Sequence, residues 1–393
     1  MKIGVYLDEY KPEDGGGYTM QSELFRALCN IRNESAHEFV VISLPNHRIV
    51  EKSRAEGFTW IADNRFSLIE QIGEYLARTW PNFRRRFHWR NSLERKARAD
   101  GVDFIWFLGP RPRQIDLPYL TIVLDLQHRK QPWFPEVSEY GEWNTRERLL
   151  SAFLRRAAGI IVGTKAGKRE VAHFFQVPDE CIHILPHPTP DYWHSRSASE
   201  EIAADPTLQP GFLFYPAQFW AHKNHVNLLL ALKHLADEGL KIPLVLTGSD
   251  FGNQSFVKAQ IAELNLEDQV RILGFIDQGQ LKWLYRNALA LSYLSFFGPE
   301  NLPPLEAFTL GCPVIASNVD GSEEQLGDAA LLVDPKNPRE IASAVRKLFE
   351  DKALRSKLIE RGLNRAKNWV SEDFVRGVFK VFDEFEPVRR NWA

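Results

Sequence analysis

A loop followed by a proline-led helix carries the strongest chemical signal in this chain. The sequence FGPENLPPLEAFTLGCPVIASN, residues 297–318, leaves an apolar run and starts a helix at the proline pair 303–304, since proline is favoured in a first helical turn. The amino end of a helix attracts anions, so the pattern predicts a diphosphate site. An ordinary loop–helix–strand crossover, with Glu306 complementing the helix dipole, is the alternative. The amides that would donate to such an anion are those of Asn301, Leu302 and Leu305.

A second signal is a lysine placed where a strand passes into a helix. In FLFYPAQFWAHKNHVNLLLAL, residues 212–232, a short loop follows the strand and Lys223 stands at the helix start. An ammonium group there would stabilise the negative charge that builds on a departing diphosphate. A surface lysine at a helix start is the alternative.

Two further constellations lie in the first half of the chain. The segment DGGGYTM, residues 14–20, includes Gly16 and Gly17, and adjacent glycines allow a ligand to approach the backbone closely. A plain tight turn is the alternative. Asp125 and His128 follow the apolar run Leu120–Leu124, at the strand end where open α/β sheets place their ligands. A structural pair joined by hydrogen bonds explains these two residues equally well.

The elements that must position these residues form two series. Short apolar runs alternate with amphipathic stretches, which favours parallel sheets covered on both faces and predicts the α/β class. A stretch rich in Pro, Ser and small polar residues near 190–210 predicts domains of 1–200 and 201–370. Residues 371–393 are expected to form a helix that returns to the first domain. The expected strands are Ile3–Leu7, Phe39–Leu44, Phe104–Leu108, Leu120–Leu124, Gly159–Val162, His183–Leu185, Phe212–Tyr215, Leu244–Thr247, Arg271–Leu273, Ala288–Leu294, Val314–Ala316 and Ala330–Val333.

The composition narrows the class of protein. A formal charge of -2 over 393 residues argues against a nucleic-acid binder. The 3 cysteines are widely spaced without a CxxC pair, which argues against a disulfide framework or zinc cluster and fits the cytoplasm. Acidic residues near the N-terminus argue against a signal peptide, and no apolar run reaches the roughly 20 residues that span a bilayer. Any membrane contact is therefore expected to be peripheral.

One segment combines basic and aromatic residues. Residues 77–98, ARTWPNFRRRFHWRNSLERKAR, interleave arginines with Trp80, Phe83, Phe87 and Trp89. Such a surface suits an anionic lipid or a phosphorylated acceptor, for example at the inner face of a membrane. A solvated helix with its apolar face packed on the domain is the alternative.

The segment 297–318 resembles the donor-binding signature of retaining glycosyltransferase family four, whose members have the GT-B fold of two Rossmann-like domains facing each other across a cleft. The family pattern is Glu-Gly-x-Gly-x-x-x-x-Glu, and its second glutamate, which binds the donor ribose, matches Glu306. Gly298 stands where the first glutamate is usual, so the resemblance implies that Glu300 or the backbone contacts the hexose instead. Lys223 matches a family lysine on the diphosphate, while Gln218 replaces the usual arginine.

The same resemblance implies further contacts. Gly248 ends a matching strand, and the family's nucleobase contact maps onto Phe275 and Ile276, although structural turns would explain these positions too. The resemblance also implies that the glycine loop of the first domain faces the cleft. Asp125 or His128 would accept the acceptor's proton or steady the reacting sugar.

The resemblance implies a retaining, metal-independent hexosyltransferase without a cofactor, since the Asp-x-Asp pattern of metal-dependent glycosyltransferases is missing. The expected donor is UDP-glucose or GDP-mannose, and the expected acceptor is a glycan or a lipid-linked saccharide. Two other classes stay open. One is an epimerase or phosphorylase on the same fold, and the other is a non-catalytic sugar-nucleotide-binding partner in polysaccharide assembly, which Gln218 and Gly298 would suit.

Overall fold

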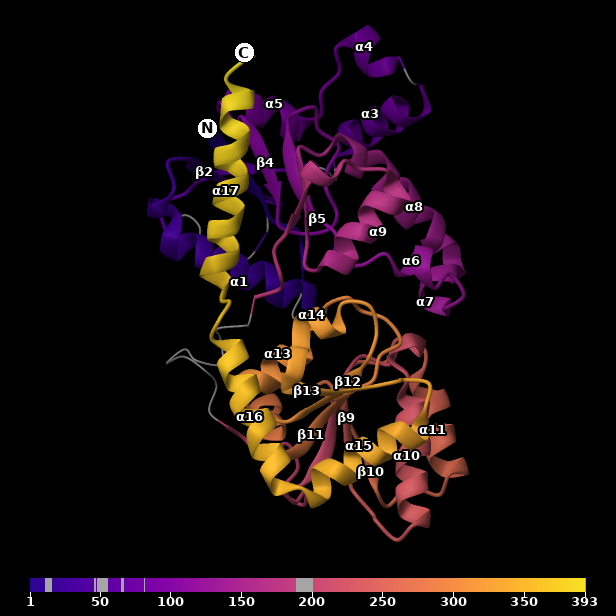
Figure 1. The fold of residues 1–393 in the computed structure, drawn as a ribbon. Coiled ribbons are helices and arrows are strands. Elements are labelled where there is room, and N and C mark those ends of the chain that lie inside the picture. Colours follow the sequence, from indigo (N-terminus) through magenta and orange to yellow (C-terminus); the bar gives the residue numbers. More distant parts are fainter. Residues whose placement is uncertain are drawn as a thin grey trace.

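The computed structural model describes residues 1–10, 16–45, 47, 56–64, 67–80, 82–188 and 201–392. Two α/β domains lie end to end, each built on one parallel sheet (Figure 1). The first sheet has the strand order β3-β2-β1-β4-β5-β6-β7, and the second has the order β10-β9-β8-β11-β12-β13. The predicted α/β class with two Rossmann-like domains is confirmed.

The first sheet is buried on both faces because its strands are almost wholly apolar. Along β1, Ile3 and Val5 enter the core beneath two helices, whereas Tyr6 joins the core on the opposite face, as the two-residue repeat of a strand requires. The strands are β1 (Lys2–Tyr6), β2 (Glu38–Ser43), β3 (Thr59–Ala62), β4 (Phe104–Phe107), β5 (Tyr119–Ile122), β6 (Gly159–Val162) and β7 (Ile182–Ile184).

Helices α1 (Gly16–Ile31) and α17 (Ser371–Arg389) pack on each other and on one face of this sheet (Figure 1). The last helix thus returns to the first domain, where Phe374, Phe379 and Phe382 join its core. The helices between β3 and β7 are α3 (Leu68–Thr79), α4 (Phe83–Phe87), α5 (Ser92–Ala99), α6 (Gln127–Lys130), α7 (Pro135–Ser138), α8 (Glu142–Phe153) and α9 (Lys165–Phe175).

The second sheet is built in the same way around a single large apolar core. Its strands are β8 (Phe212–Pro216), β9 (Leu244–Thr247), β10 (Val270–Gly274), β11 (Ala288–Tyr293), β12 (Val314–Ser317) and β13 (Ala330–Val333). Its helices are α10 (His225–Asp237), α11 (Gln254–Glu263), α12 (Gln278–Asn287), α13 (Leu302–Thr309), α14 (Ser322–Leu326), α15 (Pro338–Glu350) and α16 (Lys352–Ala366).

All twelve expected strands are present with small shifts at their ends, and β3 was not predicted. The predicted domain boundary at 200/201 touches residues 189–200, and the glycine segment begins at residues 14–15; both stretches lie outside the described residues. Nowhere in the described ranges is there a helix with the length and apolar character needed to cross a bilayer.

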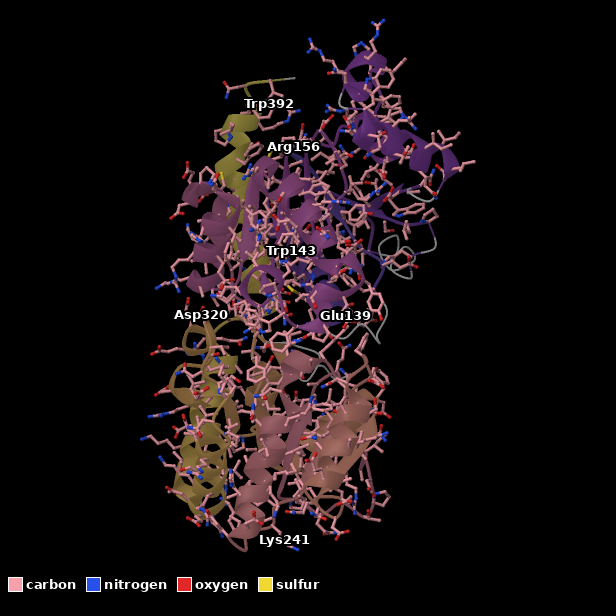
Figure 2. All side chains as sticks on the ribbon, turned by 90° about the vertical axis from the view of Figure 1, so that its right-hand side faces the viewer. Glu139, Trp143, Arg156, Lys241, Asp320 and Trp392 are labelled. Atoms are coloured by element: carbon pink, nitrogen blue, oxygen red, sulfur yellow. The ribbon has the colours of Figure 1, made fainter. Side chains whose placement is uncertain are left out.

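The loops that leave the carboxyl ends of the two sheets meet between the domains. Lys130, beyond β5, pairs with Asp320, beyond β12, at 2.7 Å. Glu324 caps the first turn of α9 across the interface by accepting from the amides of Lys165 and Ala166 at 2.7 and 3.1 Å. In Figure 2 the labelled Asp320 and Glu139 lie at the level where the domains meet. Loops at this edge are where open α/β sheets bind ligands.

Candidate functional site

The amino end of α13 faces the first domain. A Cβ atom placed on Gly16, the first residue of α1, would lie 3.4 Å from Leu302 Cδ1, the first residue of α13. The prolines after Leu302 lack N–H groups, and the Leu302 amide has no acceptor within the described part of the chain. The Asn301 amide, expected to be open to an anion, instead donates to Gln325 Oε1 at 3.0 Å. An anion at this helix end would therefore meet Leu302 N–H first.

The four residues His222–His225 each have a separate structural role. Lys223 Nζ donates to the Tyr293 hydroxyl at 2.9 Å, and Tyr293 lines a small cavity with Asn301 and Pro304. This contact links the lysine to the loop that enters α13. Asn224 adopts a left-handed backbone with φ of 57°, and its amide donates to the carbonyls of Leu294 and Pro335.

The two histidines beside Lys223 face different surroundings. His225 is buried against Phe219 with ring centroids 4.8 Å apart, and burial lowers its pKa to about 3. His222 contacts the carboxylate of Glu136 in the first domain, and burial lowers the pKa of His222. The lysine is therefore held between a core residue and an interdomain contact, which keeps its position well defined.

Glu306 lies in the second turn of α13. Its Oε2 accepts from the Tyr285 hydroxyl at 2.7 Å, and the side chain is almost fully buried. A carboxylate one turn inside the helix is thus fixed by an aromatic hydroxyl from α12. The geometry orients Glu306, and its predicted contact with a ribose stays a prediction.

The remaining predicted donor contacts lie at the same edge of the second sheet. Gly248 has φ of 133°, and a Cβ there would lie 2.3 Å from the Ala217 carbonyl oxygen, so packing alone requires glycine. The Gln218 side chain accepts from the Trp220 indole N–H at 2.9 Å. Phe275 is exposed, whereas Ile276 packs against the core of the second domain. Of these positions, Phe275 presents the largest free surface to a ligand.

In the first domain, Asp125 and His128 lie in different environments. Asp125 accepts from the Gln127 amide at 3.0 Å and from Arg146 Nη1 at 3.2 Å, and it lines a small cavity with Gly163 and Pro299. His128 is fully buried beside Glu147, and burial lowers its pKa. Between the two residues, the geometry favours Asp125 as the group that could meet a substrate.

Glu300 points into the first domain. Its Oε1 accepts from the His187 amide at 2.8 Å, and a Cβ placed on Gly163 would lie only 1.2 Å from Oε2. Burial raises the pKa of Glu300 to about 8, so the carboxyl is protonated at neutral pH. In this conformation the group is enclosed, which differs from the expectation that it contacts the donor hexose.

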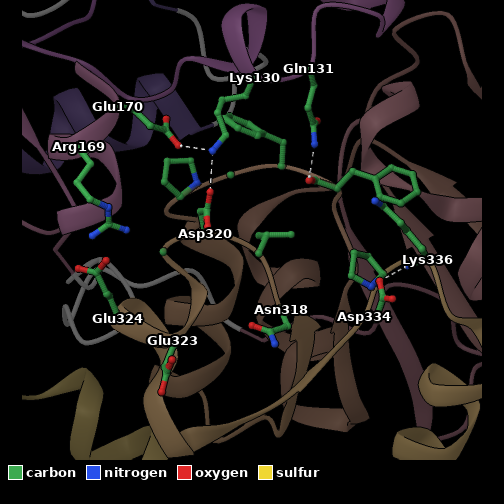
Figure 3. A pocket seen from close by; sticks show the side chains of 17 residues that line it. Lys130, Gln131, Arg169, Glu170, Asn318, Asp320, Glu323, Glu324, Asp334 and Lys336 are labelled. Carbon is green, nitrogen blue, oxygen red and sulfur yellow. Dashed lines mark hydrogen bonds and ion pairs between the residues drawn. The ribbon is translucent and has the colours of Figure 1, made fainter. Parts of the chain in front are cut away.

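A cavity of about 530 Å³ lies between the domains. Its wall includes Lys130, Arg169 and Lys336 along with several carboxylates (Figure 3). Figure 3 shows the Lys130 ammonium group between Glu170 and Asp320, at 3.2 and 2.7 Å. Gly298 lines this cavity, whereas Lys223 and Glu306 do not.

The structure thus brings Gly16, Leu302 and, through Tyr293, Lys223 towards one part of the interface, while Asp125 and Glu300 lie nearer to Gly163. Sequence reasoning missed Gly163, His187 and Tyr293. The glycine at the end of β6 was a signal for close approach, but nothing in the sequence pointed to its partner. No cluster of three or more metal-binding side chains occurs within the ranges the structure describes.

Residues 199–365 match the family model described as glycosyl transferases group 1. O-antigen chain mannosyltransferase B of Escherichia coli is 30% identical over 235 residues, which cover 58% of this chain and 61% of that protein. O-antigen chain mannosyltransferase RfbU of Salmonella typhimurium is 24% identical over 244 residues, 62% of each chain. The matches thus span about three fifths of the length of these relatives.

Solved structures match over almost the whole chain. Sucrose-phosphate synthase from Thermosynechococcus elongatus has a TM-score of 0.70 at 19% identity and covers 98% of this chain and 99% of its own. Anabaena HepE in complex with UDP-glucose has a TM-score of 0.64 at 16% identity and covers 98% of this chain and 100% of its own. The chain therefore has the GT-B fold, and its residues 199–365 are similar to glycosyl transferases group 1.

Proposed function

We propose that this protein transfers a hexose from a nucleotide-sugar donor to a glycan or a lipid-linked saccharide during synthesis of a cell-surface polysaccharide. The close approach of Gly16 to Leu302 carries the proposal, because it sets the backbone of one domain against the amino end of a helix in the other. A helix end with an unpaired amide suits a diphosphate. The names of the two O-antigen mannosyltransferases support the same class of reaction.

The donor is bound mainly by the second domain in this proposal. Leu302 N–H and the Lys223 ammonium group bind the diphosphate, Glu306 binds the ribose, and Phe275 with Ile276 contacts the base. Lysine and helix amide take the place of a metal ion, and no cofactor is required. UDP-glucose and GDP-mannose are the donors to test first, since the solved HepE complex holds UDP-glucose while the two O-antigen relatives are named as mannosyltransferases.

The acceptor approaches from the first domain, at the cytoplasmic face of the membrane. Its hydroxyl oxygen bonds to the anomeric carbon on the face that the diphosphate leaves, so the configuration is retained. The bond from that carbon to the phosphate oxygen breaks, and the departing diphosphate takes the hydroxyl proton. Asp125, whose carboxylate is partly exposed beside Gly163 and Pro299, orients the acceptor. Closure of the domains excludes water that would hydrolyse the donor.

A panel of nucleotides in a thermal-shift assay tests the donor site, because a ligand that binds the folded state raises the melting temperature. UDP, GDP and their sugars should raise the melting temperature of the parent protein. Glu306→Ala should remove the shift. Tyr285→Phe is the matched control, since it removes the hydroxyl bonded to Glu306 but keeps the carboxylate. An unchanged nucleotide shift in Glu306→Ala would overturn the assignment of Glu306.

Release of nucleoside diphosphate with and without acceptor tests the reaction itself. Acceptor-dependent release supports transfer, and retention is checked by the anomeric configuration of the product. Donor binding without turnover against any saccharide would instead indicate a non-catalytic binding partner. Release without an acceptor and without a new glycoside would indicate another reaction on the same fold, such as epimerisation.

A further inference from the structure

Helix α3 turns its apolar side to solvent. Its outward face carries Leu68, Ile69, Ile72 and Tyr75, and the first two are 72% and 77% exposed. These residues recur at helical spacing and form one stripe. An amphipathic helix of a globular domain normally packs that stripe against the core, so α3 is oriented in the opposite way.

The inward face of α3 is polar, and its contacts prevent the helix from rotating to turn the apolar face inward. Buried Glu70 accepts from the Ser92 amide at 2.9 Å and pairs with Arg95 at 3.2 Å. Glu74, one turn further, pairs with Arg113 at 3.1 Å. Between them Gly73 packs so closely on Trp89 that an added Cβ would lie 2.3 Å from its ring. These contacts fix the rotation of the helix and keep the apolar stripe outside.

The segment that follows extends the same surface and adds positive charge. Trp80 and Phe87 are 47% and 57% exposed, and their rings lie 5.6 Å apart. Arg85 and Arg86 of α4 are also exposed, and neither forms an ion pair within the described ranges. Both helices lie at the end of the first domain that faces away from the second domain (Figure 1). We call these eight residues, Leu68, Ile69, Ile72, Tyr75, Trp80, Arg85, Arg86 and Phe87, the α3–α4 surface.

We infer that the α3–α4 surface docks on the interface of an anionic lipid bilayer. Apolar side chains enter the boundary between headgroups and acyl chains, aromatic rings suit the headgroup level, and arginines bind lipid phosphates. The unpaired arginines favour this occupant over a second copy of the chain, because two copies meeting at this surface would place like charges together. The inference does not depend on the donor or acceptor proposed above.

Flotation of the full chain with vesicles tests the inference. The parent should float with vesicles that contain phosphatidylglycerol and much less with phosphatidylcholine alone, and salt should weaken the binding. The variant Leu68→Ser/Ile69→Ser/Ile72→Ser should bind about tenfold less or weaker still, since each apolar side chain contributes to partitioning. The matched control Phe256→Ser/Phe349→Ser, which changes exposed phenylalanines of the second domain, should bind like the parent.

Charge is tested separately by Arg85→Glu/Arg86→Glu, which should reduce binding to anionic vesicles by about fivefold or more for each arginine. Lys352→Glu/Lys357→Glu, on the exposed side of α16, is its control and should have no effect. Equal flotation of the apolar variant and the parent, or no flotation of the parent, would overturn the inference. So would an apolar variant that changes only the oligomeric state, because a second copy would then be the occupant.

Discussion

Replacing Gly163 by alanine should hinder closure of the two domains without unfolding either one. Gly163 follows β6, and its φ is not in the left-handed region, so its own backbone accepts a side chain. An added Cβ would, however, lie 1.2 Å from Glu300 Oε2 and 1.9 Å from its Cδ. The methyl group and the carboxyl cannot occupy the same space, so Glu300 must leave its place between the domains.

The free-energy cost of displacing Glu300 follows from the hydrogen bond that it accepts between the domains. Once it leaves, the His187 amide loses its acceptor at 2.8 Å within a partly buried interface. A buried amide left without a partner costs about 1–3 kcal/mol, which corresponds to about 5- to 150-fold in the population of the closed state. The catalytic efficiency with a saturating acceptor should fall by a similar factor, because the proposed reaction needs the closed state.

Closure can be measured directly by fluorescence energy transfer between dyes on the two domains, for example at engineered cysteines replacing exposed Lys241 and Glu139. The donor nucleotide should shift the parent towards the closed distance and shift Gly163→Ala less. The melting temperature should change little, since the methyl group conflicts with a flexible side chain and not with the core of the first domain.

A double-mutant cycle with Glu300→Ala isolates the contact. Once the carboxyl is removed, alanine at position 163 has no conflict with it, so Gly163→Ala should have almost no further effect in that background. An equal effect of Gly163→Ala in both backgrounds, or no effect in either, would refute the reasoning.

Three further predictions concern single groups. Burial raises the pKa of Glu300 to about 8 from an ordinary value of 4.5. The protonated form therefore stabilises closure below pH 4.5, and this contribution is lost as pH rises through about 8. Because glutamine does not titrate, Glu300→Gln should show a flatter pH profile of closure over this range. Lys223→Ala should reduce the preference for UDP over UMP by about tenfold or more, measured by calorimetry, whereas equal loss for both would contradict a diphosphate role. Asp125→Asn should lower turnover with little change in melting temperature, whereas His128→Ala should mainly lower the melting temperature, by several degrees, because that side chain is fully buried.

The fold was largely predictable because buried parallel strands are short apolar runs between helices. Strand β3 was missed since it reads TWIA, with Thr59 exposed, Trp60 and Ala62 partly buried and only Ile61 buried, as is typical of the edge of a sheet. Helix α3 was missed for a related reason. Its apolar residues do recur at helical spacing, but the function of that stripe depends on which side of the helix the domain covers. Only the contacts of Glu70, Gly73 and Glu74 decide that side.

The candidate site was predictable where one segment contains both the functional residue and the structural element that positions it. The helix that begins at Leu302 was predicted from its prolines, and the position of its amino end follows from the same segment. The partners across the interface could not be predicted, because Glu300 meets Gly163 and His187 only after two separate domains have folded and met. The burial of His128 also depends on α8, whose position the local sequence does not reveal.

The glycine at position 298 is a structural requirement of this chain, and restoring the usual glutamate of the resembled family should therefore damage the site. Gly298 has φ of 137°, which is costly for any other residue, and a Cβ there would lie 2.6 Å from Asn301 Oδ1. The Asn301 amide group also donates to the Gly298 carbonyl at 3.1 Å, so the side chain cannot move away without losing that bond.

Backbone strain of this kind costs about 1–3 kcal/mol, and Gly298→Glu should lower the melting temperature by a few degrees and reduce activity. Gly298→Ala, with the same φ but no charge, separates strain from chemistry and should lower the melting temperature similarly. A Gly298→Glu protein that kept the parent's melting temperature and gained activity would show instead that the loop can rebuild around a hexose-binding glutamate. The loop seen here would then be one of two accessible conformations, and the enclosed position of Glu300 would belong to only one of them.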